Sequence, residues 1–170
     1  MTRMGCRLSR PTESTLHCEG KLRPGEYSIA GNISSQYVTG LLFALSLLEG
    51  SSFIRIVGPL ESAPYVQITR HALRSFYIDP DDLGKNKPVS PAEIVVEGDW
   101  SNAAFYLTAN KLGSNIEVNN LNTDSPQGDR AVISILTTLS EAPAIDCTDI
   151  PDLVPILAVT AGSKKGAKFV

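Results

Sequence analysis

The chain has 170 residues, enough for one ordinary domain or two small ones with a buried core. Hydrophobic residues make up 42% and charged residues 19%, which predicts a globular fold and excludes an extensively disordered chain. The formal net charge is −3 and no run rich in lysine and arginine occurs, so the charge balance does not favour DNA or RNA as a partner.

Cysteine spacing and hydropathy exclude further classes of protein. Cys6, Cys18 and Cys147 lie far apart without a CxxC pair, so neither a disulfide framework nor a zinc site is predicted. The longest apolar stretch, Leu41–Leu48, is much shorter than the roughly 20 residues that cross a membrane. Because Met1–Arg10 also lacks the apolar region of a secretion signal, we expect a cytoplasmic protein without a membrane partner.

Apolar spacing and turn residues predict a chain in which helices and strands alternate. In chain order the predicted elements are strands over 14–17 and 26–29, a helix that follows 31–36 and ends at Gly50, a strand over 53–57, a helix over 64–76, a helix that follows 98–102 and ends at Gly113, a strand over 115–118, and a helix over 130–139. The stretch Asp79–Glu93, rich in Asp, Pro, Lys and Asn, is predicted to be a surface excursion or a crossing between domains.

This order of elements repeats along the chain. The copies that begin at Gly31 and Gly98 each contain a capped helix, a strand, a turn with a leucine, and a helix started by a proline. A third copy begins at Asp149–Asp152 and is incomplete. The predicted fold class is therefore α/β or α+β, built from repeated β-α-β-α units that are incomplete at both ends. Open sheet edges and apolar helix faces there make self-association an expected consequence.

The polar start of each repeated helix is a candidate binding site. Free backbone N–H groups and the positive end of the helix dipole favour a phosphate or a carboxylate at such a terminus. Ser34 and Ser35 add two hydroxyl groups and Gln36 adds an amide, although ordinary N-capping is the commoner explanation of such serines. Asp152 has the corresponding position in the third copy, where it either complements the helix start or moves a proton.

Other polar residues near these helices have plain structural explanations. Ser62 and Tyr65 lie at the start of the second predicted helix, where capping and core packing would account for them. Arg70, Arg74 and Lys85 have the charge to meet an anion, but solvated surface charges are the commoner case. Neither a Walker loop, a dinucleotide fingerprint, a nucleophile elbow nor a metal-binding spacing is present in the sequence.

Four segments, in their order and spacing, carry a family resemblance. They are Gly31–Leu42 with Ser-Ser-Gln, Glu61–Val66 with Ser-x-Pro-Tyr, Glu97–Phe105 with Glu-Gly-Asp-x-Ser-x-Ala, and Pro151–Ala158 with Pro-Asp. Together they resemble the 5-enolpyruvylshikimate-3-phosphate synthase family. The resemblance implies a two-domain fold of repeated β-α-β-α-β-β units. Residues 1–92 would be the C-terminal part of the domain on the shikimate 3-phosphate side, and 93–170 the first part of the second domain.

The resemblance also implies an activity and a set of site residues. The family transfers the enolpyruvyl group of phosphoenolpyruvate to the 5-hydroxyl of shikimate 3-phosphate, on the pathway to aromatic amino acids, and no metal or organic cofactor is implied. The residues that the resemblance assigns are Ser34, Ser35 and Ser62 for binding shikimate 3-phosphate, Gln36 for facing phosphoenolpyruvate, Tyr65 for lining the shikimate pocket, and Asp152 for holding the shikimate hydroxyl and accepting its proton.

Two alternatives stay open at this point. A UDP-N-acetylglucosamine enolpyruvyl transferase would share the fold, but those relatives use a reactive cysteine in a mobile loop, and none of the three cysteines lies in a matching segment. A non-catalytic binding module would share the fold without the chemistry.

The family's early Lys-Ser and Arg residues and its later basic residues have no counterpart in this sequence, which therefore resembles an internal part of the enzyme. Those cations compensate the negative charges of two phosphorylated substrates. We therefore expect no transferase activity from this chain by itself.

Overall fold

The computed structural model describes residues 4–139, 144–163 and 168–170. Helices and strands are mixed along the chain, as the sequence predicts for the α/β class. The chain divides into two compact units, which are described separately below. The first consists of Met1–Leu60 and Thr69–Ala92, and the second of Glu61–Ile68 and Glu93–Val170.

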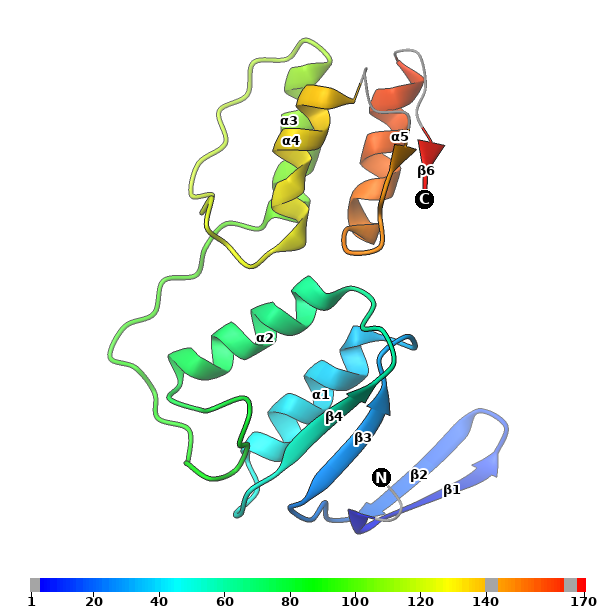
Figure 1. Ribbon diagram of the computed structural model, residues 1–170, viewed down its shortest axis with the longest axis vertical. Helices are drawn as coiled ribbons and strands as arrows, with labels where there is room; N and C mark the ends of the chain where they lie inside the picture. The colour runs from blue at the N-terminus through cyan, green and yellow to red at the C-terminus, as the bar shows by residue number, and fades with distance from the viewer. Residues whose placement is uncertain (1–3, 140–143, 164–167) are drawn as a thin grey trace. The chain divides into compact units, whose positions relative to one another are not determined.

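The described part of the first unit combines two pairs of strands with two helices. The antiparallel pair is β1 (Cys6–Thr12) with β2 (Thr15–Gly20), the parallel pair is β3 (Glu26–Ala30) with β4 (Phe53–Val57), and the helices are α1 (Ser35–Ser46) and the part of α2 (Ala63–Ser75) from Thr69 onward. In Figure 1, α1 lies between the β3–β4 pair and α2. The hydroxyl groups of Thr39 on α1 and Thr69 on α2 are 3.0 Å apart and hydrogen-bonded.

Helix α1 begins where the sequence predicts a cap. Ser34 has extended backbone (φ −170°), and its hydroxyl oxygen accepts a hydrogen bond from the backbone N–H of Gln36 at 3.2 Å. The apolar residues that follow are spaced three and four apart, so they share one face of the helix. The buried apolar residues of this face are Val38, Leu41, Leu42 and Leu45.

The C-terminal end of α1 is held by the segment that follows α2. The backbone groups of Ser52 and Leu83 exchange two hydrogen bonds, of 2.7 and 3.0 Å. The next residue, Gly84, has a φ of +78°, and a Cβ built on it would lie 2.5 Å from the carbonyl oxygen of Gly50. Only glycine therefore fits this close approach, which anchors the start of the predicted surface excursion.

Three helices form the core of the second unit. They are α3 (Trp100–Lys111), α4 (Val132–Thr138) and α5 (Val154–Gly162), accompanied by the parallel pair β5 (Ala144–Ile145) and β6 (Lys168–Phe169) and by the first turns of α2. Figure 1 shows α3, α4 and α5 side by side. Their buried cluster consists of Trp100, Ala104, Val132, Leu136, Leu139, Ile145, Cys147, Ile150, Leu153, Ile156, Leu157 and Ala161.

Trp100 fixes the start of α3 within this core. Its side chain is 1% exposed, and its indole N–H donates to the carbonyl oxygen of Asn122 at 3.0 Å. Its backbone N–H donates to Oε1 of Gln127 at 2.8 Å. The preceding residue, Asp99, caps the helix by accepting from the backbone N–H of Ser101 at 2.9 Å. The polar cap predicted for this helix is confirmed.

The structure also corrects two local predictions. The strand predicted over 115–118 is absent, because these residues have no strand partner in the described part of the chain. Instead, the backbone N–H and carbonyl of Ile116 each bond to the side-chain amide of Asn110, at 2.7 Å. Strand β1 was not predicted. Its sequence contains Pro11 and two arginines, and only Cys6 of the strand is buried. The repeat of β-α-β-α units is not confirmed by these elements and stays a prediction.

Shortening a buried side chain in the core of the second unit is expected to lower the stability of the chain. Leu157 is fully buried on α5, and its substitution by alanine is expected to lower the free energy of unfolding by about 2–5 kcal/mol, because it leaves a cavity. Trp100 is the sole tryptophan of the chain, so its fluorescence in a urea titration reports on this unit. Val159→Ala on the same helix is the control: Val159 is 65% exposed, and about 0.5 kcal/mol or less is expected. Equal losses in the two variants would contradict this core.

Candidate functional site

A hydrogen bond between Tyr65 and Asp152 is the centre of the candidate site. Both residues belong to the second unit, although they are 87 positions apart in sequence. The Tyr65 hydroxyl, in the first turn of α2, donates to Oδ2 of Asp152 at 2.7 Å. Asp152 lies in a 3-10 turn, Pro151–Leu153, directly before α5. Tyr65 is half-buried and Asp152 is exposed, so the carboxylate is oriented while it stays accessible to a ligand.

The start of α2 is joined to the Asp152 segment a second time. The backbone N–H of Ala63 donates to Oδ1 of Asp149 at 3.2 Å. Ser62, immediately before the helix, has a φ of +54°, in the left-handed region that non-glycine residues rarely adopt. Such strain costs about 1–3 kcal/mol and persists only where the surroundings enforce it. Ser62, Tyr65 and Asp152 are thus brought to one place in the second unit.

The surroundings of Tyr65 raise the pKa of its phenol. Burial raises the pKa of its phenol well above the usual 10, and the hydrogen bond to Asp152 raises this pKa further. The negative charges of Asp129, Asp152 and Asp99 act in the same direction. Tyr65 is therefore a neutral phenol at physiological and moderately alkaline pH, and its hydroxyl can only donate to the Asp152 carboxylate.

Asp129 is a buried acid that sequence reasoning missed. It is 4% exposed, and its Oδ2 accepts a hydrogen bond from the hydroxyl of Ser101. Burial raises the pKa of Asp129; the Ser101 bond lowers this pKa in part, and the charges of Asp152 and Asp99 raise it again. The one feature of the sequence that could have pointed to Asp129 is its place directly after Gly128 at the start of a helical turn.

Ser34, Ser35 and Gln36 form a separate polar group at the start of α1 in the first unit. Ser34 caps the helix, which is the commoner explanation of a serine at this position. Its hydroxyl oxygen accepts the capping bond, so its hydroxyl proton can still be donated to a ligand. Ser35 is the first residue of the helix and half-buried, and Gln36 is exposed. Their hydroxyl and amide groups lie beside first-turn backbone N–H groups, which suits an anion.

Comparison with known proteins matches most of the chain to one family. A family model described as "EPSP synthase (3-phosphoshikimate 1-carboxyvinyltransferase)" matches residues 3–152. The chain belongs to the EPSP synthase family. Family membership does not favour the UDP-N-acetylglucosamine enolpyruvyl transferase alternative.

Curated relatives support this membership and show how much of the family's length is covered. Proteins named 3-phosphoshikimate 1-carboxyvinyltransferase are 35% identical in Clostridium novyi, 37% in Clostridium acetobutylicum and 36% in Brachyspira hyodysenteriae. The matches cover 91%, 89% and 91% of this chain, but 41%, 40% and 43% of the relatives. The chain thus spans about two fifths of the length of these EPSP synthases.

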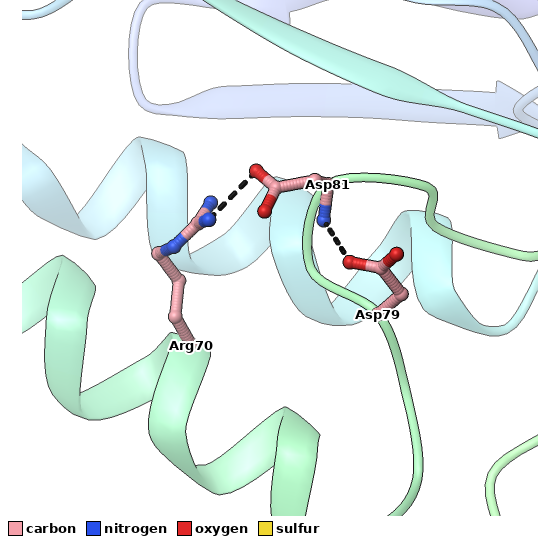
Figure 2. Close-up of polar contacts among 3 residues, drawn as sticks. All are labelled: Arg70, Asp79 and Asp81. Carbon is pink, nitrogen blue, oxygen red and sulfur yellow. Dashed lines mark hydrogen bonds and ion pairs between the residues drawn. The ribbon is translucent and has the colours of Figure 1, made fainter.

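Arg70 has an internal partner in the first unit of this EPSP synthase family member. Its guanidinium lies 2.7 Å from Oδ1 of Asp81, and the backbone N–H of Asp81 donates to Oδ1 of Asp79 at 2.9 Å (Figure 2). The Arg70 side chain is 22% exposed and the Asp81 side chain 69%, so the pair adds little stability. In the described structure the charge of Arg70 is paired with Asp81 at the loop after α2.

Within the three described ranges, the structure shows no group of three or more His, Cys, Asp or Glu residues that could hold a metal ion. Among the helices of those ranges, none is long and apolar enough to span a bilayer.

Replacing the Asp129 carboxyl by an amide is expected to change how stability depends on pH. Because the folded-state pKa of Asp129 lies above 3.8, the folded state binds more protons than the unfolded state between the two pKa values. Its stability therefore falls as pH rises through that window. Asp129→Asn should be more stable than the parent chain at pH 7, and this advantage should vanish below pH 3.8.

The measurement is a series of urea titrations, followed by Trp100 fluorescence, across that range of pH. Asp124→Asn is the control, because it makes the same change of charge at an exposed position. An advantage of Asp129→Asn that stays constant over all pH values would contradict the raised pKa.

Proposed function

We propose that this chain supplies the hydroxyl-binding and proton-accepting part of the site in a 3-phosphoshikimate 1-carboxyvinyltransferase. That enzyme transfers the enolpyruvyl group of phosphoenolpyruvate to the 5-hydroxyl of shikimate 3-phosphate. The observation that carries the proposal is the 2.7 Å hydrogen bond from Tyr65 to Asp152, two residues that the family resemblance assigns to the same substrate. Membership of the EPSP synthase family supports it independently.

In this proposal Asp152 is the catalytic base. Its carboxylate accepts the proton of the 5-hydroxyl while the oxygen of that hydroxyl bonds to the enolpyruvyl carbon and phosphate leaves. Tyr65 occupies one lone pair of Oδ2 and leaves the other lone pairs of the carboxylate free for the substrate. Because Tyr65 is a neutral donor, it orients the base without competing for the proton.

Phosphate recognition falls to the serines. Ser34 and Ser35 would donate hydroxyl protons to the phosphate of shikimate 3-phosphate, where the α1 dipole also favours an anion. Ser62 would bind the same substrate, and the exposed Gln36 would face phosphoenolpyruvate.

We assign residues 1–92 to the shikimate 3-phosphate side of the family's fold and 93–170 to its second domain, each built from the family's repeated β-α-β-α-β-β units. Several further expectations stay predictions from the sequence: a cytoplasmic location, self-association, and the absence of nucleic-acid and membrane partners.

Isothermal titration of the chain with shikimate 3-phosphate tests the proposal. Ser35→Ala should weaken binding by roughly tenfold or more, because a hydrogen bond to a charged group contributes about 1.5–3 kcal/mol. Ser35 is preferred to Ser34, whose removal would also uncap α1. Ser51→Ala is the matched control, since Ser51 is an exposed serine of the same unit outside the helix start.

A second ligand separates phosphate recognition from recognition of the ring. Shikimate without its phosphate should bind equally to the parent chain and to Ser35→Ala. If the parent chain does not bind shikimate 3-phosphate, or if Ser35→Ala binds it as the parent does, the proposed site is wrong. Turnover with phosphoenolpyruvate at a normal rate would contradict the expectation that the chain alone is inactive.

A further inference from the structure

Asp129 has a buried carboxylate oxygen without a hydrogen-bond partner. Its Oδ2 accepts from the hydroxyl of Ser101, while its Oδ1 has no partner among the described residues, although Asp129 is only 4% exposed. Most buried polar atoms in folded proteins have a partner, either in the protein or in an ordered water molecule. Because burying an unpaired carboxylate oxygen costs free energy, Oδ1 needs a hydrogen-bond donor.

A small cavity of the second unit lies against this carboxyl group. Its volume is about 20 Å³, and roughly 10–15 Å³ is enough to hold one water molecule. Its walls come from the first turns of α2 (Pro64, Tyr65 and Ile68), from Ser101 on α3 and from residues 127–129. The cavity therefore has room for a single small molecule between the start of α2 and the turn that carries Asp129.

The other polar side chains of this cavity have no proton left for Oδ1 of Asp129. The Ser101 hydroxyl already donates to Oδ2 of the same carboxyl group. The side-chain amide of Gln127 donates to a carboxylate and to a backbone carbonyl, both at 3.0 Å. The Tyr65 hydroxyl donates to Asp152 at 2.7 Å. Since these donors are engaged, the donor for Oδ1 has to be a bound molecule.

A water molecule has the size and the hydrogen-bonding groups for this place. It donates two hydrogen bonds, one of them to Oδ1 of Asp129, and the hydroxyl oxygen of Ser101 and Oε1 of Gln127 are acceptors for the other. A divalent metal ion is a poorer match, because calcium and magnesium take about six or more ligands. Within the described part of the chain, no group of three or more His, Cys, Asp or Glu residues could hold one.

We propose that the second unit binds one long-lived water molecule between Asp129 and the first turns of α2. The water donates a hydrogen bond to Oδ1 of Asp129 and links the 3-10 turn Gly128–Ala131 to the helices that line the cavity. Gly128 permits this close packing, since a Cβ placed on it would lie 2.9 Å from Cγ of Pro64. The water site does not depend on the proposed function, because it needs no substrate.

Magnetic relaxation dispersion of ¹⁷O-enriched water tests this site, because it detects intact water molecules that stay bound long enough to tumble with the protein. The parent chain is compared with Asp129→Leu, which replaces the carboxyl group by an apolar side chain of similar size. This variant should bind one long-lived water molecule fewer than the parent chain. Asp124→Leu is the matched control, because it makes the same change at an exposed position of the same unit and should leave the number unchanged.

Trp100 fluorescence shows whether each variant is folded. An equal number of long-lived water molecules in the parent chain and in folded Asp129→Leu would overturn the proposal. If Asp129→Leu does not fold, a crystal structure of the parent chain decides, and it should show an ordered water molecule about 2.5–3.0 Å from Oδ1 of Asp129. A cavity that is empty or holds anything other than water would overturn the proposal, as would an Oδ1 that bonds to a protein group.

Discussion

The hydrogen bond from Tyr65 to Asp152 joins two segments that lie 87 positions apart in sequence, and the candidate site depends on it. It ties the first turn of α2 to the turn before α5, and the bond from Ala63 to Asp149 fixes the same two segments a second time. A hydrogen bond to a charged group contributes about 1.5–3 kcal/mol, but only while the donor keeps its proton. Burial and the neighbouring carboxyl groups raise the pKa of Tyr65, so the phenol keeps its proton over a wider range of pH.

The charges of the second unit bear on which part of the proposed phosphorylated substrate it would hold. Asp99, Asp129 and Asp152 all act on the same phenol, so this site repels anions and suits hydroxyl groups and protons. The start of α1 in the first unit has the opposite character, with serine hydroxyls and first-turn N–H groups and without an acid in its first turn. Arg70 in the first unit is paired with Asp81. In the proposed function, proton acceptance would therefore fall to the second unit and phosphate recognition to the start of α1 in the first.

Sequence analysis predicted the local features of this fold and missed the contacts that make the site. The starts of α1 and α3 were predictable because capping residues and apolar spacing act over a few positions. The strand expected over 115–118 was wrong because alternation cannot show that Asn110 would bond to the backbone of Ile116. The family resemblance named Tyr65 and Asp152 individually, and their roles stay predictions. The buried acid Asp129 was missed because nothing in its local pattern shows a contact with segments that are distant in sequence.

The most direct measurement is the exchange rate of the Tyr65 hydroxyl proton, followed by NMR in the parent chain and in Asp152→Ala. A hydroxyl that donates to a carboxylate at 2.7 Å should exchange slowly enough with water to give a resolved resonance in the parent chain, and this resonance should be lost when the acceptor is removed. A Tyr65 hydroxyl that exchanges equally fast in both chains would contradict the hydrogen bond on which the site depends.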